Sequence, residues 1–191
     1  MTDILPVIRR NGIPVKSRTS ANIRDFAEKF RKRLVEIMGD FGNRCPIDKV
    51  FERLGSPEHN CYSIEILPDD APELKDCLAT TDTANKVIKI KEYVYEEACK
   101  GGGHARFTLA HELGHLFLKH EFSGNFAMMP GQKIPAYIDS EWQADLFAAE
   151  LLMPKELVEG KDASDIAREC GVSYTAAKIR KERLEREAKK I

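Results

Sequence analysis

The sequence predicts an α+β fold in which a small, mostly antiparallel sheet packs among helices. Two stretches, 106–118 and 139–154, are apolar around most of their circumference, which is typical of helices buried in a core. Between 62 and 91, apolar and polar residues alternate in short runs separated by turn-forming residues, as in half-buried strands. With 191 residues, the chain has one or at most two domains and can bury a substantial core.

The N-terminal part of the chain is expected to be an arm followed by two helices. Residues 1–18 lack apolar periodicity, so we predict a flexible arm. Apolar residues then recur every three or four positions, which predicts an amphipathic helix from its N-cap Ser20 to Met38. Its basic residues are expected on the solvated face and do not indicate a nucleic-acid surface. A shorter helix is predicted over 45–55, with Pro46 in its first turn.

Three segments in the middle of the chain form the predicted sheet. Residues 62–66 alternate between apolar and polar side chains, and segments 78–81 and 86–91 flank a turn at 82–85, which predicts one strand and one hairpin. A helix over 92–99 follows. The three glycines after it lack the Walker spacing and the Lys-Ser or Lys-Thr of a phosphate-binding loop, so they are interpreted as a flexible connector.

The buried stretch 106–118 contains His111-Glu112-x-x-His115. Residues four apart lie on one face of a helix, so the two imidazoles can point at one zinc ion while the glutamate acts as a general base. The alternative is a solvated face of histidine and glutamate side chains. The apolar surroundings disfavour this alternative, because buried imidazoles without partners destabilise a fold.

The second buried stretch, 139–154, is expected to supply a third ligand. Glu141 and Asp145 are four residues apart and share a helix face. We predict that Glu141 completes a His-His-Glu zinc site and that Asp145 accepts a hydrogen bond from the far nitrogen of a liganding histidine, which orients the ring. In the alternative interpretation, Glu141 is an acid favoured by the helix dipole and Asp145 is a surface residue.

The two stretches together resemble a known family. Arg-Phe-Thr-Leu-Ala-His-Glu-Leu-Gly-His, paired with Glu-x-x-Ala-Asp-x-Phe-Ala-Ala-Glu-Leu-Leu-Met-Pro, is similar to the ImmA/IrrE family of zinc metallopeptidases. The resemblance runs from about Cys61 through Pro154 and more loosely to the C-terminus. It implies a zincin-like metallopeptidase core, with Zn²⁺ bound by the residues matching His111, His115 and Glu141 and with Glu112 as the catalytic base.

The resemblance also implies a kind of substrate. Members of the family cleave a helix-turn-helix transcriptional repressor at a specific site and thereby relieve repression of stress genes or of a mobile element. We therefore predict a zinc metalloendopeptidase acting on such a repressor. Two alternatives remain: a regulator that binds DNA or protein and has a structural or inactive metal site, and a partner that sequesters a repressor without cutting it. Loss of Glu112 distinguishes the peptidase from both.

The C-terminal residues 163–180 have the pattern of a helix-turn-helix, with Gly171 in the turn and Ser173 as a cap. In one interpretation the second helix enters a DNA major groove and the basic tail contacts phosphates. In the other, both helices pack on the peptidase core and the tail is solvated, which we favour. The predicted organisation is an arm over 1–18, a metallopeptidase domain over 19–160 and a helical region over 161–191.

Composition restricts the remaining classes. The formal net charge is −1, which indicates neither nucleic acid nor membrane as a dominant partner. The five cysteines are scattered without a Cys-x-x-Cys pair, so neither a disulfide framework nor a structural zinc knuckle is indicated. A signal segment and an apolar run of about twenty residues are both missing from the sequence, so we expect a cytoplasmic protein.

The segment 121–138 has little periodicity although it contains several large apolar residues. Loops of this length in compact domains are often functional, so we predict a lid or a binding wall over the cleft. His120, immediately before it, is five residues past His115 and is therefore rotated off the metal-facing side of the helix. We do not expect His120 to be a fourth ligand, because a catalytic zinc keeps one position open.

Overall fold

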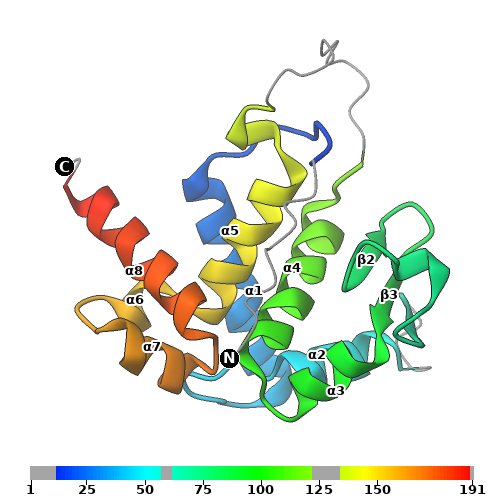
Figure 1. Cartoon of the computed structure of the whole chain (residues 1–191). Helices are drawn as coiled ribbons and strands as arrows, with labels where there is room; N and C mark the ends of the chain where they lie inside the picture. Colours follow the sequence, from blue (N-terminus) through cyan, green and yellow to red (C-terminus); the bar gives the residue numbers. More distant parts are fainter. Residues whose placement is uncertain (1–11, 57–61, 122–133, 190–191) are drawn as a thin grey trace, which may run out of the picture.

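The computed structural model describes residues 12–56, 62–121 and 134–189. They form a mixed α+β fold in which the sheet lies on the opposite side of the central helices from the C-terminal helices (Figure 1). The elements, in chain order, are α1 (Ser20–Met38), α2 (Ile47–Leu54), β1 (Ser63–Leu67), η1 (Pro72–Leu74), β2 (Ala79–Asp82), β3 (Val87–Lys91), α3 (Glu92–Cys99), α4 (Gly103–Leu118), η2 (Ala136–Ile138), α5 (Ser140–Leu152), α6 (Lys155–Val158), α7 (Ala163–Cys170) and α8 (Tyr174–Ala188).

The first helix begins one residue earlier than the sequence predicted. Thr19, not Ser20, is the N-cap of α1: its hydroxyl accepts from the Asn22 backbone N–H at 3.2 Å. The Asn22 side chain in turn accepts from the Thr19 backbone N–H at 3.4 Å. This reciprocal pair satisfies two of the amide groups left free at a helix start. The helix ends at Gly39, whose φ of 83° is readily adopted only by glycine.

The three strands are arranged in the order β1-β3-β2. The predicted hairpin is present, because β2 and β3 pair antiparallel. The prediction of a mostly antiparallel sheet is wrong for β1, which pairs parallel to β3. Residues 68–78, including η1, carry the chain from one edge of the sheet to the other, and a crossover of this kind permits parallel pairing. As a result β2 is an edge strand.

The helices α4 and α5 lie side by side in the centre of the molecule (Figure 1). Their close approach depends on Gly114, since a Cβ at this position would lie 2.9 Å from the Cα of Ala144. Large apolar side chains from both helices, including Leu109, Leu113 and Phe147, are fully buried. The two stretches predicted to be core helices therefore form the core together.

Residues 12–18 are not free, contrary to the predicted flexible arm. The Val15 N–H donates to the Ile138 carbonyl at 2.9 Å, and the Arg18 N–H donates to the Tyr137 carbonyl at 2.8 Å. Val15 is also only 1% exposed. This segment therefore packs as an extended chain along η2. The rest of the predicted arm lies outside the described residues, as does most of the segment predicted to be a lid or binding wall.

The C-terminal helices α7 and α8 pack on the same core. Ala163, Ile166 and Ala177 are buried in the hydrophobic cluster that contains α4 and α5. The turn between the two helices is held by α4, because the Arg106 Nε donates to the Gly171 carbonyl at 2.8 Å. A Cβ on Gly103 would lie 2.3 Å from the carbonyl carbon of Val172. The helix-turn-helix-like turn is thus packed against the start of α4.

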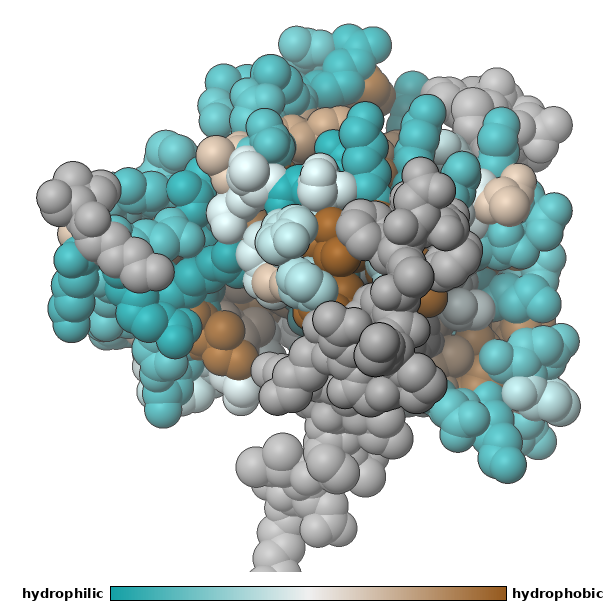
Figure 2. All heavy atoms as spheres, turned by 90° about the horizontal axis from the view of Figure 1, so that it is seen from above, coloured by the Kyte–Doolittle hydropathy of each residue, from teal (hydrophilic) through white to brown (hydrophobic). Residues whose placement is uncertain are grey.

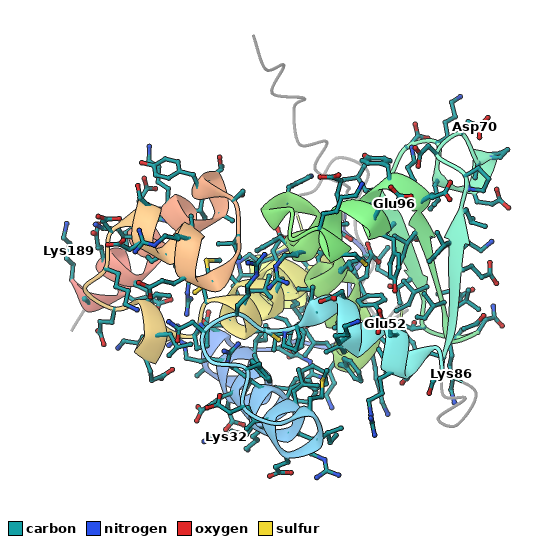
Figure 3. The ribbon with its side chains drawn as sticks, turned by 90° about the horizontal axis from the view of Figure 1, so that it is seen from below. Lys32, Glu52, Asp70, Lys86, Glu96 and Lys189 are labelled. Carbon is teal, nitrogen blue, oxygen red and sulfur yellow. The ribbon has the colours of Figure 1, made fainter. Side chains whose placement is uncertain are left out.

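The surface carries charges of both signs. Figure 3 labels acidic and basic side chains on α1, α2, α3, the loops and the end of α8, and all of them are exposed. On the face in Figure 2, hydrophilic residues predominate and hydrophobic residues gather in small areas. Within the described ranges, no helix is both long and apolar enough to cross a lipid bilayer.

Candidate metal centre

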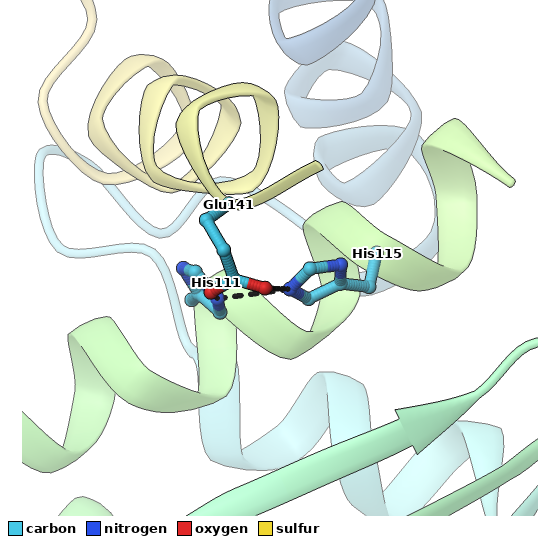
Figure 4. Close-up of side chains that lie close together, drawn as sticks. All are labelled: His111, His115 and Glu141. Carbon is cyan, nitrogen blue, oxygen red and sulfur yellow. Dashed lines mark hydrogen bonds and ion pairs between the residues drawn. The ribbon is translucent and has the colours of Figure 1, made fainter. Parts of the chain in front are cut away.

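Two histidines of α4 and one glutamate of α5 point toward one another (Figure 4). The Nε2 atoms of His111 and His115 lie 2.9 Å apart. The Glu141 carboxylate faces both, with Oε2 3.3 Å from the Nε2 of His111 and Oε1 3.4 Å from the Nε2 of His115. The ligand atoms of all three residues lie within 4.8 Å of one another. The i, i+4 spacing on α4 and the packing of α5 on α4 together produce this convergence.

The donor set of this cluster fits zinc. Two imidazole nitrogens and one carboxylate oxygen are ligands that Zn²⁺ binds in catalytic sites, where three protein ligands leave the fourth position open. The side chains are 15%, 11% and 22% exposed for His111, His115 and Glu141 respectively, so the cluster is shielded but accessible. Among the described residues, this is the cluster of histidine, cysteine and acidic side chains that can hold a metal ion.

The start of α5 positions Glu141. Asp139 is the N-cap, and its Oδ1 accepts from the Glu141 backbone N–H at 2.9 Å. Asp139 also forms an isolated β-bridge with Pro14 of the docked N-terminal segment. Glu141 is therefore in the first turn, as the helix-dipole interpretation supposed, but its carboxylate is directed at the histidines.

The far nitrogen of His111 contacts Asp145. Asp145 Oδ1 lies 2.8 Å from the His111 Nδ1, although the Asp145 side chain is 63% exposed. Burial alone lowers the pKa of His111, but hydrogen bonds to Asp145 and Glu141 and the charge of Glu112 raise this pKa to about 10. Without a metal, His111 therefore binds a proton among three acids. A metal ion at this position competes with that proton.

His120 contacts the far nitrogen of the other histidine, which the sequence did not predict. The His120 Nδ1 lies 2.9 Å from the His115 Nδ1, and the His120 Nε2 lies 3.1 Å from the Gln143 Oε1. The left-handed conformation of Lys119, with φ of 55°, returns the chain toward α4 and brings His120 there. Burial, together with the charge of Arg18, lowers the pKa of His120 to about 4.

The motif glutamate is anchored to the sheet. Glu112 is 2% exposed, and its Oε2 accepts from the Thr81 hydroxyl at 2.7 Å. Thr81 is on the edge strand β2. Because threonine is common in strands for packing reasons, no local signal in the sequence marked Thr81 as a site residue.

A cleft of about 740 Å³ lies along the sheet. Residues of all three strands, η1, the β2–β3 turn and the segment directly after α4 line it. Two of its lining residues contact the cluster: Thr81 contacts Glu112, and His120 contacts His115. The cleft lining therefore includes two residues that contact the cluster, but none of the candidate metal ligands and not Glu112.

Residues 70–182 match the profile of peptidase family M78, described as the IrrE N-terminal-like domain. The match covers more than half of the chain and includes the whole cluster. The chain belongs to this family. The resemblance to ImmA/IrrE proteins is thereby confirmed, and the matched M78 region continues through α7 into α8.

A solved structure, described as a Mycobacterium tuberculosis transcriptional regulator, shares the fold of this M78 chain. The TM-score is 0.50 at 13% sequence identity, and the alignment covers 80% of this chain and 54% of that one. This chain therefore spans about half the length of that regulator. At this identity the similarity concerns the fold alone. No curated protein matches the sequence.

Proposed function

We propose that this M78 chain is a zinc-dependent endopeptidase that cleaves a helix-turn-helix transcriptional repressor at a specific site. The observation that best supports this proposal is the convergence of His111, His115 and Glu141 beside a buried glutamate that the edge strand β2 holds through a hydrogen bond. Family membership supports the same class of chemistry.

In this proposal each residue of the cluster has a distinct role. His111, His115 and Glu141 bind zinc, which supplies Lewis acidity and lowers the pKa of water when it is bound. Glu112 takes a proton from the attacking water and passes it to the leaving amine. Thr81 holds the Glu112 carboxylate in position, and Asp145 orients the ring of His111.

The edge strand is the proposed substrate-binding element. An extended peptide can add to β2 as a further strand, so that main-chain hydrogen bonds provide affinity and the cleft receives side chains. Glu73, Asp82 and Glu121 line the cleft, whereas Lys89 is 3.8 Å from Glu65 and is partly neutralised by it. This acidic lining favours a basic segment. DNA-binding repressors present such segments, because they bind phosphates.

The alternatives without catalysis are less well supported. A structural zinc is normally closed by four protein ligands and needs no general base, whereas the described cluster offers three ligands with Glu112 beside them. A DNA-binding role for α7 and α8 is disfavoured by the packing of their turn on α4. A chain that only sequesters a repressor would retain its function without Glu112.

A cleavage assay tests the proposal. The purified protein with zinc is incubated with the helix-turn-helix repressor encoded nearest to its gene, and fragments are identified by intact mass. We expect discrete fragments with the wild type and with Glu97→Ala, an exposed acid on α3, but none with Glu112→Ala. Equal binding of the repressor by all three proteins without any cleavage would instead support sequestration.

A further inference from the structure

The two candidate zinc ligands of α4 differ in what contacts their far nitrogens. The Nδ1 of His111 faces a carboxylate, which can only accept a hydrogen bond while it is ionised. The Nδ1 of His115 faces the Nδ1 of His120, and a neutral imidazole nitrogen either donates or accepts. Which nitrogen of His120 carries hydrogen therefore decides which nitrogen of His115 has the lone pair.

The contacts of Gln143 determine which ring nitrogen of His120 carries hydrogen. The Gln143 Nε2 donates to the backbone carbonyls of Lys16 and Tyr137, both at 2.9 Å. Carbonyl oxygens only accept, so the amide nitrogen of Gln143 must face them and its Oε1 must face His120. The Oε1 also only accepts. The His120 Nε2, 3.1 Å away, therefore carries the hydrogen. Gln143 is fully buried, so water does not replace these partners.

The hydrogen on His120 in turn determines the tautomer of the candidate metal ligand His115. His120 is buried, and its ring nitrogens face an amide oxygen and an imidazole rather than a carboxylate. Burial against such groups favours the neutral ring, so a hydrogen on Nε2 leaves a lone pair on Nδ1. The His115 Nδ1, 2.9 Å away, must then donate. This places the ring lone pair of His115 on Nε2, the atom that faces His111 and Glu141.

We propose that Gln143 and His120 act as a relay of positioning residues that holds His115 in the one tautomer able to bind metal through Nε2. The relay rests on the proposed zinc site but not on peptide cleavage. It gives His115 a neutral, buried counterpart to the exposed carboxylate that orients His111. Such partners orient a ligand and increase its basicity.

Nitrogen NMR of the metal-free wild type tests the relay without any substitution. The chemical shifts and couplings of the ring nitrogens report which of them carries hydrogen. We expect the His115 ring to be protonated on Nδ1 and the His120 ring on Nε2. A His115 ring protonated on Nε2 would overturn the proposal.

Zinc affinity, measured by competition with a chromophoric chelator, is the second test. His120→Phe removes the acceptor, and we expect affinity to fall by about 10–100-fold. His120→Asn keeps an acceptor oxygen close to the position of the Nδ1 and should recover most of the loss. His104→Phe, an exposed histidine at the start of the same helix, is the matched control and should bind like the wild type.

The outcomes separate this relay from the proposed function. If His120→Phe is folded by circular dichroism and binds zinc as tightly as the wild type, the relay is wrong even where the repressor is cut. If the tautomers and affinities are as expected but no repressor is cleaved, the relay is supported and the peptidase proposal fails. Equal losses in His120→Phe and His120→Asn would also count against the relay, because the acceptor would then not be the feature that matters.

Discussion

The two ends of α5 use glutamate in opposite ways. Near the last turn, the Glu150 side chain is 2% exposed, and its carboxylate accepts from Arg180 at 2.8 and 2.5 Å and from Arg24 at 3.1 Å. In the first turn, the Glu141 side chain is 22% exposed and its oxygens lie 3.3 and 3.4 Å from imidazole nitrogens. In the described part of the chain, no lysine or arginine pairs with Glu141.

The difference separates a structural carboxylate from one suited to a metal. Both oxygens of Glu150 are taken by permanently charged guanidinium groups from α1 and α8, so Glu150 joins three helices. The partners of Glu141 are imidazoles, which can release a proton and bind a metal instead. Glu150, whose two oxygens both accept hydrogen bonds from arginines, therefore has a structural role. Glu141, which faces histidines at longer distances, is suited to bind a metal ion.

The largest effect on stability is expected at the C-terminal end of α5, where Glu150 lies. Glu150→Ala leaves the guanidinium of Arg180 buried without its carboxylate partner, so the free energy of unfolding should fall by about 3–5 kcal/mol. Urea denaturation of the metal-free protein measures this. Glu156→Ala, an exposed acid on α6, should change stability by less than about 0.5 kcal/mol. Similar small losses in both variants would show that the buried ion pair does not hold α8 on the core.

An intermediate effect is expected where the two helices meet. Gly114→Ala places a methyl group against the α5 backbone at Ala144, and overpacking of this kind costs about 1–3 kcal/mol. Because α5 must move away from α4, zinc affinity should fall as well. Denaturation and chelator competition on the same sample measure both. A variant with unchanged zinc affinity would mean that the spacing of α4 and α5 does not set the ligand geometry.

The smallest effect on the stability of the metal-free protein is expected at the N-terminal end of α5, where Glu141 lies. Glu141→Gln removes a partly exposed charge, so the free energy of unfolding without zinc should change by about 1 kcal/mol or less. Zinc at one hundred times its dissociation constant should stabilise the wild type by about 2.7 kcal/mol and Glu141→Gln hardly at all. Thermal unfolding with and without zinc measures this. If zinc raised the unfolding temperature of both proteins equally, Glu141 would not be a zinc ligand.

The sequence predicted features that depend on contacts within one helix better than features that depend on contacts between distant segments. The convergence of His111 and His115 depends on helix periodicity alone, and the placing of Glu141 and Asp145 on one face follows from the same rule. Two residues of the C-terminal pattern have the local roles expected of them, since Ser173 caps α8 and Gly171 in the turn has a φ of 64°. The docking of that turn on α4 depends on tertiary contacts that the pattern does not encode.

The features that the sequence did not predict have other physical causes. Alternation assigns side chains to the faces of a sheet but not the direction of a strand, so the parallel pairing of β1 was missed. His120 reaches His115 only through a left-handed residue, and Thr81 reaches Glu112 only through the placing of β2. The residues 12–18 dock through main-chain hydrogen bonds, which have no signature in side-chain composition.

The docked segment 12–18 has a consequence for comparisons between relatives. It contributes to the metal centre through the backbone carbonyl of Lys16, which Gln143 contacts, and every amino acid has such a carbonyl. Residue 16 can therefore vary freely during evolution without disturbing the contact, and neither invariance nor correlated substitution would reveal it. Shortening the chain past this point would remove a support of the centre even though it deletes no metal ligand.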